Sequence, residues 1–257
     1  MSEIEPTQVD ILIVGSGMAG LSAALYAGRY ELKTLVIGHE FGGATSTAWT
    51  VENYPGFKSI DGYDLMIKVK EQVEGVGVKI ISDKVVELDK VAAGFVIATE
   101  HGEEVTARAI IMANGAARRK LGLPKEGEFA KGKGLHYCTT CDGPLYKGKT
   151  IGVVGSGDAS VKGMNLAVQY AEKIYSLVRG DKLKAEPINY SRLEPHLGKE
   201  VEVLFKTEVK ELLGEDRLTG VKLSNGRELP LDGLFVEIGA VPEVELVQKL
   251  GVTLDKY

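Results

Sequence analysis

One glycine-rich pattern occurs twice in this chain and limits what the chain can fold into. The first copy spans residues 9–38 and reads as an apolar strand, a G-x-G-x-x-G turn, a helix and a second apolar strand that ends near Ile37. In such a turn Gly15 makes the tight bend, Gly17 lets backbone amides approach a pyrophosphate, and Gly20 lets the helix pack closely on the strand. This order predicts a dinucleotide-binding module rather than glycines that serve only a turn.

The second copy spans residues 149–180. Its strand is followed by Gly155 and Gly157, and its helix opens near Ser160, which stands where the third small residue belongs. Another apolar strand then ends near Val178. The repeat predicts a second module of the same kind.

The residues that follow the second strand differ between the two copies. Glu40 lies 20 residues beyond Gly20, where a carboxylate accepts hydrogen bonds from a ribose 2′-hydroxyl. The second copy has Arg179 there, with Lys182 and Lys184 close behind. Cations suit the 2′-phosphate of NADP better than the bare hydroxyl of NAD. The alternative is a solvated basic loop.

Short strands with alternating polarity follow each module. They occupy residues 80–112 and 201–243, with a hairpin turn expected at Asn225–Gly226. We therefore predict an α/β chain with two Rossmann-like dinucleotide-binding modules, each carrying a small antiparallel β insertion. The joins between the modules are expected near Ala116–Ala117 and near Gly239–Pro242.

Composition removes several classes of function. Hydrophobic residues make up 44% and charged residues 26%, with a formal net charge of −5, a balance that favours neither nucleic acid nor an anionic membrane as partner. No apolar run approaches the roughly 18 residues of a membrane span, and the amino terminus has no apolar signal region. A cytoplasmic protein is expected.

The only two cysteines, Cys138 and Cys141, form a C-x-x-C motif that Asp142 follows directly. A structural zinc site needs more ligands than this motif supplies, so no metal is expected. A dithiol at this spacing can open and close a disulfide by exchange, and the carboxylate can move the proton; the alternative for Asp142 is a turn or helix cap. The histidines are interpreted as surface or satisfied core residues: His39, His101, His136 and His196.

Several motifs together resemble the low-molecular-weight thioredoxin reductases, a group of FAD-containing pyridine nucleotide-disulfide oxidoreductases. The resemblance runs from about residue 9 to the last residue. In order, the motifs are GSGMAG at 15–20, GHEFGGA at 38–44, VENYPGF at 51–57, MANGA at 112–116, YCTTCDG at 137–143, VGSGDAS at 154–160 and VEIGAVPE at 236–243.

The resemblance implies an FAD domain at 1–116 and an NAD(P) domain at 117–242 that carries the C-x-x-C. It implies hydride transfer from NADPH to FAD, a swing of the second module, and reduction of the disulfide, with Cys141 facing the flavin and Cys138 attacking thioredoxin. A homodimer is also implied. Thr47 and Asn53 would lie near the flavin, and Trp49 would pack. The predicted cofactor-binding residues are Gly15, Gly17, Gly20, Glu40, Gly42, Gly43, Thr47, Asn53, Gly115, Gly155, Gly157, Asp158, Ala159, Ser160, Arg179 and Lys184.

The sequence departs from the family pattern at several positions. Ala44 replaces a glutamine, and Asn114 replaces a threonine. In the loop for the 2′-phosphate, the family pattern HRR followed by an arginine becomes Val178, Arg179, Gly180 and then Lys184. One bidentate donor is lost and another is weakened to a point charge, so NADH stays possible beside NADPH. Of the segment that completes the FAD domain in the family, only 243–257 is present, and a truncated chain is expected.

Other functions stay open at this stage. Within the same class, the flavoprotein could serve a glutaredoxin-like protein in peroxide defence or draw electrons from ferredoxin. From a different class, a nucleotide-binding redox sensor would use the dithiol to change its contacts without turnover.

Overall fold

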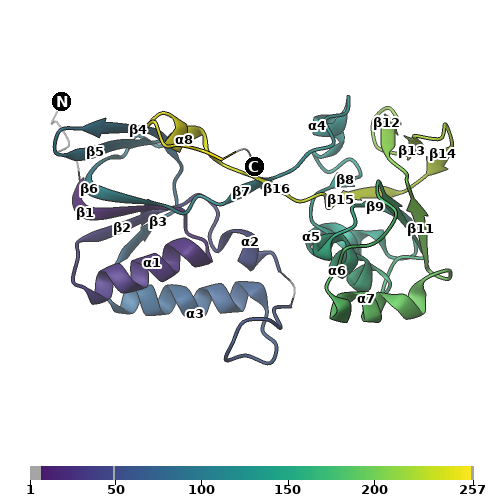
Figure 1. Cartoon of the computed structure of the whole chain (residues 1–257), viewed down its shortest axis with the longest axis horizontal. Coiled ribbons are helices and arrows are strands. Elements are labelled where there is room, and N and C mark those ends of the chain that lie inside the picture. The colour runs from purple at the N-terminus through teal and green to yellow at the C-terminus, as the bar shows by residue number, and fades with distance from the viewer. Residues whose placement is uncertain (1–6, 49, 256–257) are drawn as a thin grey trace. The chain divides into compact units, whose positions relative to one another are not determined.

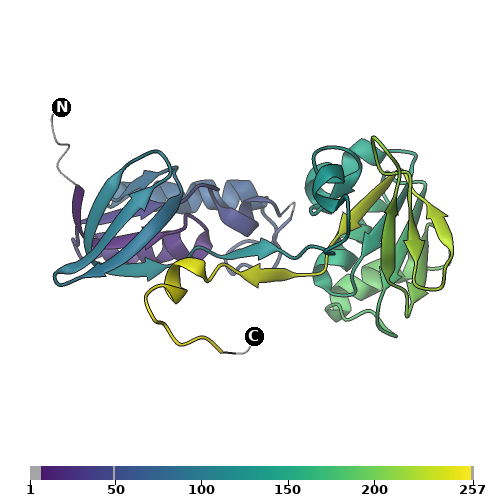
Figure 2. The ribbon, with the colours of Figure 1, turned by 90° about the horizontal axis from the view of Figure 1, so that it is seen from above.

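The computed structural model describes residues 7–48 and 50–255. The chain divides into two compact units, Met1–Ala116 with Pro242–Tyr257, and Ala117–Val241 (Figure 1). The chain passes between the units twice. The two passages pair with each other as short strands β7 (Ala116–Arg118) and β16 (Ala240–Pro242) (Figure 2).

The first unit contains a six-stranded sheet in the order β3-β2-β1-β6-β5-β4. The first four strands in this order are parallel to one another, and the last two continue the sheet as antiparallel strands. In chain order the strands are β1 (Thr7–Val14), β2 (Thr34–Ile37), β3 (Lys79–Ile81), β4 (Val85–Val91), β5 (Gly94–Thr99) and β6 (Glu104–Met112).

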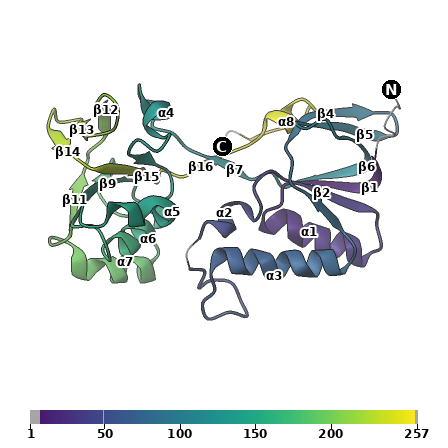
Figure 3. The ribbon, with the colours of Figure 1, turned by 180° about the vertical axis from the view of Figure 1, so that it is seen from behind.

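Alternating side chains of β1 fill both faces of this sheet, as expected for a central strand. Helices α1 (Met18–Arg29) and α3 (Gly62–Gly75) lie on one face of the sheet (Figure 3). Ile13 packs with residues of both helices. Leu12 and Val14 face the other side, where the core includes residues of β4 and β5. The short helix α8 (Glu245–Gln248) contacts β4, and α2 (Gly43–Ser46) follows β2.

The second unit contains a five-stranded parallel sheet in the order β11-β10-β9-β15-β8 and a separate three-stranded antiparallel sheet, β12-β13-β14. The parallel strands are β8 (Leu135–His136), β9 (Thr150–Val154), β10 (Lys173–Val178), β11 (Val201–Phe205) and β15 (Gly233–Val236). The antiparallel strands are β12 (Val209–Leu213), β13 (Gly220–Leu223) and β14 (Glu228–Pro230).

The two faces of this parallel sheet have different coverings. On one face the core contains residues of α6 (Asp158–Ala167) and Leu193 of α7 (Pro187–Leu193). On the other face the core contains residues of the three-stranded sheet and Phe129 of α4 (Glu126–Phe129). The remaining short helices are α5 (Thr139–Asp142), η1 (Gly143–Tyr146) and η2 (Glu194–His196).

The predicted fold class is confirmed, and the hairpin at Asn225–Gly226 joins β13 to β14. The insertions are smaller than predicted, because β3 and β11 belong to the parallel sheets. The chain turns after β3 at Asp83, whose buried carboxylate accepts a hydrogen bond from the N–H of Lys84 at 2.7 Å. Across 7–48 and 50–255, no helix has the length and apolar character to span a bilayer.

Candidate active site

The first glycine turn leaves ligand space at the middle one of its three glycines. Gly15 has a φ of +111°, and a Cβ there would lie 2.2 Å from the carbonyl oxygen of Ala113. A Cβ at Gly20 would lie 1.9 Å from the carbonyl oxygen of Gly15. At Gly17 the nearest atom, in Gly42, is 3.9 Å away. The fold itself therefore requires glycine at 15 and 20, whereas the space above Gly17 fits a pyrophosphate at the N-terminus of α1.

The segment after β2 lies against this turn. Ser16 Oγ donates a hydrogen bond to the carbonyl oxygen of Glu40 at 3.1 Å, and the N–H of Gly42 donates to the carbonyl oxygen of Ser16 at 3.0 Å. The Glu40 side chain is 78% exposed and its Oε1 lies 3.7 Å from His39 Nε2. Gly43 has a φ of +52°, and its Cβ position lies 3.5 Å from the Cα atom of Gly17. The exposed carboxylate of Glu40 fits the predicted contact with a ribose hydroxyl.

The other residues predicted to lie near the flavin are at the surface of the same unit. Thr47, Asn53 and Gly115 are exposed. Gly115 has a φ of +74° and follows the last strand of the sheet by three residues. Trp49, which was expected to pack, lies outside the described residues. The contacts of Thr47, Asn53 and Gly115 with FAD stay predictions.

The two departures in this unit differ in what they do. Ala44 lies exposed in α2, where its carbonyl oxygen accepts a hydrogen bond from Thr47 Oγ1 at 3.0 Å. Asn114 donates through Nδ2 to the carbonyl oxygen of Glu243 at 2.6 Å. Asn114 therefore has a structural role, because it ties the end of the first sheet to the returning chain.

The second glycine turn repeats the geometry of the first. Gly155 has a φ of +140°, and a Cβ there would lie 2.3 Å from the carbonyl oxygen of Glu237. At Gly157 no atom lies within 4 Å of the Cβ position. Ser160 is buried, and its Oγ donates to the carbonyl oxygen of Gly157 at 2.8 Å. Ala159 is exposed in the first turn of α6. The open space above Gly157, at the N-terminus of α6, fits a second pyrophosphate.

The carboxylate of Asp158 binds its own chain. Asp158 Oδ1 accepts hydrogen bonds from the N–H of Glu186 at 2.8 Å and from Asn189 Nδ2 at 2.9 Å. These bonds lower the pKa of Asp158. The N–H of Lys184 donates to the carbonyl oxygen of Ser156 at 2.6 Å. This bond holds the loop that carries Lys184 against the glycine turn, which places Lys184 near the expected nucleotide site.

The sequence interpretation missed one further cation beside the predicted phosphate loop. Val178 and Phe205 are register partners at the ends of β10 and β11, so Arg179 and Lys206 follow neighbouring parallel strands. The N–H of Lys206 donates to the carbonyl oxygen of Gly180 at 2.8 Å, and Lys206 has a φ of +52°. Both side chains are exposed at the carboxyl edge of the sheet, where nucleotides bind in such folds. The position directly after an apolar strand was the only signal for Lys206.

The two cysteines are joined in a disulfide, with their Cα atoms 5.4 Å apart. Cys138 is the N-cap of α5, and its Sγ accepts a hydrogen bond from the N–H of Cys141 at 3.1 Å. Cys138 is half-buried, whereas Cys141 is exposed. The dithiol is thus accessible at the start of a short helix in the second unit.

Buried Glu237 fixes this helix. Its Oε1 accepts hydrogen bonds from the N–H and the Oγ1 of Thr139, both at 3.1 Å. Its Oε2 lies 3.5 Å from Arg118 Nη1. The sequence interpretation missed Glu237, because its partners lie far from it in the chain.

Asp142 lies beside a buried histidine. Asp142 Oδ2 is 3.1 Å from His136 Nδ1, and His136 Nε2 is 2.7 Å from the hydroxyl of Tyr146. The Asp142 side chain makes no capping hydrogen bond to η1, so the capping alternative does not describe it. His136 is a satisfied core residue as predicted, but its partner is the predicted catalytic acid, a contact that the sequence did not indicate.

Two other histidines pair with carboxylates away from the dithiol. His101 Nδ1 lies 2.8 Å from Asp83 Oδ1, and His196 Nδ1 lies 3.2 Å from Glu200 Oε2. Over the part of the chain that the structure describes, no three histidine, cysteine or acidic residues are grouped as metal ligands.

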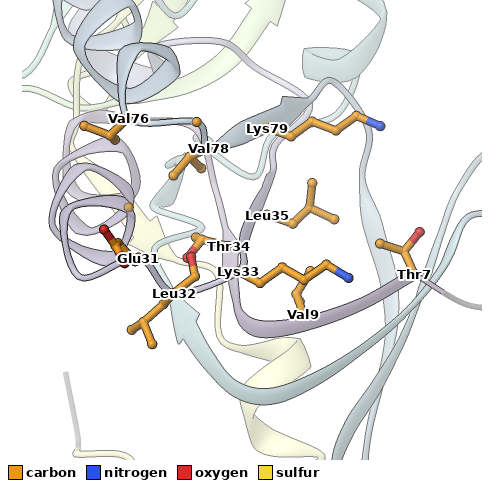
Figure 4. A pocket seen from close by; sticks show the side chains of 12 residues that line it. Thr7, Val9, Glu31, Leu32, Lys33, Thr34, Leu35, Val76, Val78 and Lys79 are labelled. Carbon is orange, nitrogen blue, oxygen red and sulfur yellow. The ribbon is translucent and has the colours of Figure 1, made fainter.

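A hollow of about 500 Å³ lies at the opposite end of the first sheet from the glycine turn (Figure 4). Val9, Lys33 and Lys79 line it, near the amino ends of β1, β2 and β3. None of the predicted site residues lines it. The hollow is therefore separate from the predicted FAD site of the first unit.

Two glycine turns with open ligand space and one accessible disulfide define a dinucleotide-dependent oxidoreductase. A family model described as pyridine nucleotide-disulphide oxidoreductase matches residues 9–257. A protein of Clostridium pasteurianum, described as a 34.2 kDa protein in the rubredoxin operon, is 36% identical over 98% of this chain and 83% of its own length. Thioredoxin reductase of Pneumocystis carinii is 40% identical over 93% of this chain and 78% of its own length.

Solved structures of thioredoxin reductases are also similar to this chain. Thioredoxin reductase of Lactococcus lactis matches with a TM-score of 0.89 at 32% identity, covering 95% of this chain and 82% of that chain. The enzyme of T. acidophilum matches with a TM-score of 0.87 at 31% identity, covering 97% and 83%. The chain therefore belongs to the pyridine nucleotide-disulphide oxidoreductase family, and the resemblance to thioredoxin reductases is confirmed. Those enzymes are FAD-dependent and use NADPH, in agreement with the predicted cofactors.

Proposed function

We propose that this protein passes electrons from NADPH through FAD to the Cys138–Cys141 disulfide, and from there to the disulfide of thioredoxin or a thioredoxin-like protein. One observation carries the proposal: the disulfide is accessible in the unit that contains the second glycine turn. A disulfide placed in this way is suited to exchange with a protein substrate. A homodimer and a cytoplasmic location stay predictions.

The two glycine turns would hold the two nucleotides. Backbone amides at Gly17 and the exposed carboxylate of Glu40 would bind FAD in the first unit. Backbone amides at Gly157 would bind the pyrophosphate of NADPH in the second unit. FAD, when bound, supplies a carrier that accepts a hydride and delivers two electrons to a disulfide.

Three cations support NADPH over NADH. Arg179 and Lys206 follow adjacent strands, and Lys184 is held against the glycine turn by its backbone. A guanidinium binds a phosphate through two hydrogen bonds, and the ammonium groups add point charges. We expect this group to bind the 2′-phosphate, so NADH should bind less tightly.

The chemistry at the dithiol needs a nucleophile and a proton carrier. Two electrons break the Cys138–Cys141 bond and give a dithiol after uptake of two protons. Cys138 as thiolate then attacks the substrate disulfide, and Cys141 resolves the mixed disulfide. Asp142 moves a proton as each thiolate forms.

Visible absorption tests the proposal directly. The purified protein, loaded with FAD, should lose its flavin absorbance on anaerobic addition of NADPH and regain it when thioredoxin disulfide is added. Cys138→Ser should still be bleached by NADPH but fail to turn over thioredoxin. If Cys138→Ser kept full turnover, the assignment of the attacking thiol would be wrong.

The same experiment separates the alternatives. A redox sensor would react once per dithiol and then stop, whereas a reductase continues until NADPH is consumed. If reduced ferredoxin bleached the flavin and NADPH did not, the electron donor would be ferredoxin. The proposed dithiol chemistry would be unchanged. Equal kcat/KM with NADH and NADPH would refute the role given to the cation group.

A further inference from the structure

The contact between His136 and Asp142 has a geometry that matters for proton transfer. His136 belongs to β8 and Asp142 ends α5, so two separate elements bring the imidazole and the carboxylate to 3.1 Å. The His136 side chain is 9% exposed and that of Asp142 is 37% exposed. One partner is thus shielded from water, while the other has access to it.

The ring of His136 is held on both sides. It stacks on Phe235 of the neighbouring strand β15, with centroids 5.2 Å apart and planes at 23°. Its Nε2 meets the Tyr146 hydroxyl at 2.7 Å. Tyr146 fits there because residue 233 is a glycine, whose Cβ would lie 2.3 Å from the Tyr146 ring.

Tyr146 sets the orientation of the imidazole hydrogen. Burial raises the pKa of Tyr146, so its hydroxyl keeps its proton at neutral pH. When this hydroxyl donates to Nε2 of a neutral imidazole, the ring hydrogen lies on Nδ1 and faces Asp142. When the imidazole is protonated, it forms an ion pair with Asp142 Oδ2 at 3.1 Å, and the pair then holds one more proton.

Reduction of the disulfide needs a proton source at neutral pH. A free aspartic acid titrates near about 3.9 and a free imidazole near about 6.5. A lone carboxylate of this kind is already ionised at neutral pH and has no proton to give. Imidazole is the side chain whose ordinary protonation range includes neutral pH, so a histidine beside the carboxylate can act as the proton source.

We propose that His136 is a positioning residue that holds Asp142 Oδ2 and shares one proton with it, so that the pair supplies a proton when the Cys138–Cys141 disulfide is reduced. Two electrons, which bound FAD would supply, break the S–S bond. One sulfur takes the proton from the pair and becomes a thiol, and the other remains a thiolate until it attacks its substrate or takes a proton from water. Water then reprotonates the pair through the accessible side of Asp142. This inference rests on the proposed function.

Other charged groups face this cluster from the elements around it. The Lys149 ammonium lies 5.6 Å from the centroid of the Tyr146 ring. Arg217 and Asp232 act on Tyr146 electrostatically with opposite signs. The carboxylate of Glu237 is satisfied by Thr139 and Arg118. None of these groups is bonded to His136 itself.

The test is the pH dependence of disulfide reduction in His136→Asn. Asparagine keeps an N–H near Asp142 but does not titrate, so the midpoint of the pH profile of the reduction rate should move to lower pH. At neutral pH the single-turnover rate should fall by about tenfold or more. His196→Asn is the matched control, because His196 also pairs with a carboxylate in this unit, and its profile should equal that of the wild type.

A purely structural role of His136 predicts a different result, namely a lower rate at every pH with an unchanged midpoint, and that result would overturn the inference. A second readout does not depend on turnover. In the full protein reduced with dithiothreitol, the His136 imidazole should titrate at a different pH from that in the oxidised protein when followed by nuclear magnetic resonance. Identical midpoints in the two states would also refute it. If NADPH failed to reduce the protein while these midpoints still differed, the proposed electron donor would fail and the proton pair would stand.

Discussion

Gly157 offers a sharp test, because the fold does not require a glycine there. Its φ is −89° and its ψ is −173°, an extended conformation that alanine adopts readily. No atom lies within 4 Å of the Cβ position. Alanine is a poorer N-cap than glycine by roughly 0.5 to 1 kcal/mol. Alanine also lowers the conformational entropy of the unfolded chain, which stabilises the folded state by about 0.4 to 1 kcal/mol and offsets that loss. Gly157→Ala should therefore change the free energy of unfolding by less than about 0.5 kcal/mol.

Nucleotide binding should respond very differently. The added methyl group occupies the space through which a pyrophosphate approaches the amides of α6. We expect NADPH to bind at least about tenfold more weakly, or about 1.4 kcal/mol. Urea unfolding followed by circular dichroism measures the first quantity, and quenching of NADPH fluorescence measures the second.

Gly155→Ala is the contrasting variant. Its φ of +140° and the Glu237 carbonyl oxygen 2.3 Å from the Cβ position leave no room for a methyl group. We expect a loss of about 2 kcal/mol or more in unfolding free energy. The reasoning would be refuted if Gly157→Ala were as unstable as Gly155→Ala, or if it bound NADPH as tightly as the wild type.

Three further predictions concern stability. Asp61→Ala should lower the unfolding free energy by about 1 kcal/mol in urea titration, because the Asp61 side chain caps two N–H groups of α3. Hydrogen bonds from Thr99 and His101 lower the pKa of Asp83 from 3.8 to about 2. The stability from Asp83 is therefore present above pH 3.8 and is lost as the pH falls through about 2, and Asp83→Asn should remove this part of the acid transition in a pH series of melting curves. Lys206→Gly should raise the unfolding free energy by about 1 kcal/mol, because glycine removes the steric strain of the left-handed backbone at this position. In calorimetry the same variant should lose more affinity for 2′,5′-ADP than for 5′-AMP, because only 2′,5′-ADP carries the 2′-phosphate.

The parts of the fold set by local chemistry were predictable. Both glycine turns were found from spacing alone, because the bend and the close helix approach each demand glycine at a fixed offset. The hairpin at Asn225–Gly226 was found for the same reason, since Gly226 has a φ of +84°. In such places a few neighbouring residues determine the backbone.

The contacts around the dithiol were not predictable, because their partners come from distant parts of the chain. Glu237 and Thr139 are 98 residues apart in sequence, and no motif spacing reports such a pair. His136 lies close to Asp142 in sequence, but their contact depends on the turn made by α5 and on Phe235 behind the imidazole. Sequence identified the reacting groups and left out the residues that hold them.

The two modules also show how one contact does two tasks. In the first unit the residue after the last strand, Ala113, closes the glycine turn: its N–H donates to Val14, and its carbonyl oxygen lies against Gly15. In the second unit Glu237 occupies the same place, because its N–H donates to Val154 and its carbonyl oxygen lies against Gly155.

The difference between the two units lies in the side chain at this shared position. Ala113 has only a methyl side chain, which forms no hydrogen bond. The carboxylate of Glu237 instead accepts hydrogen bonds from Thr139 at the start of the dithiol helix α5. Glu237 therefore contacts the nucleotide turn through its backbone and Thr139 of the dithiol helix α5 through its side chain. The first unit, with Ala113 at this position, has no side-chain connection of this kind.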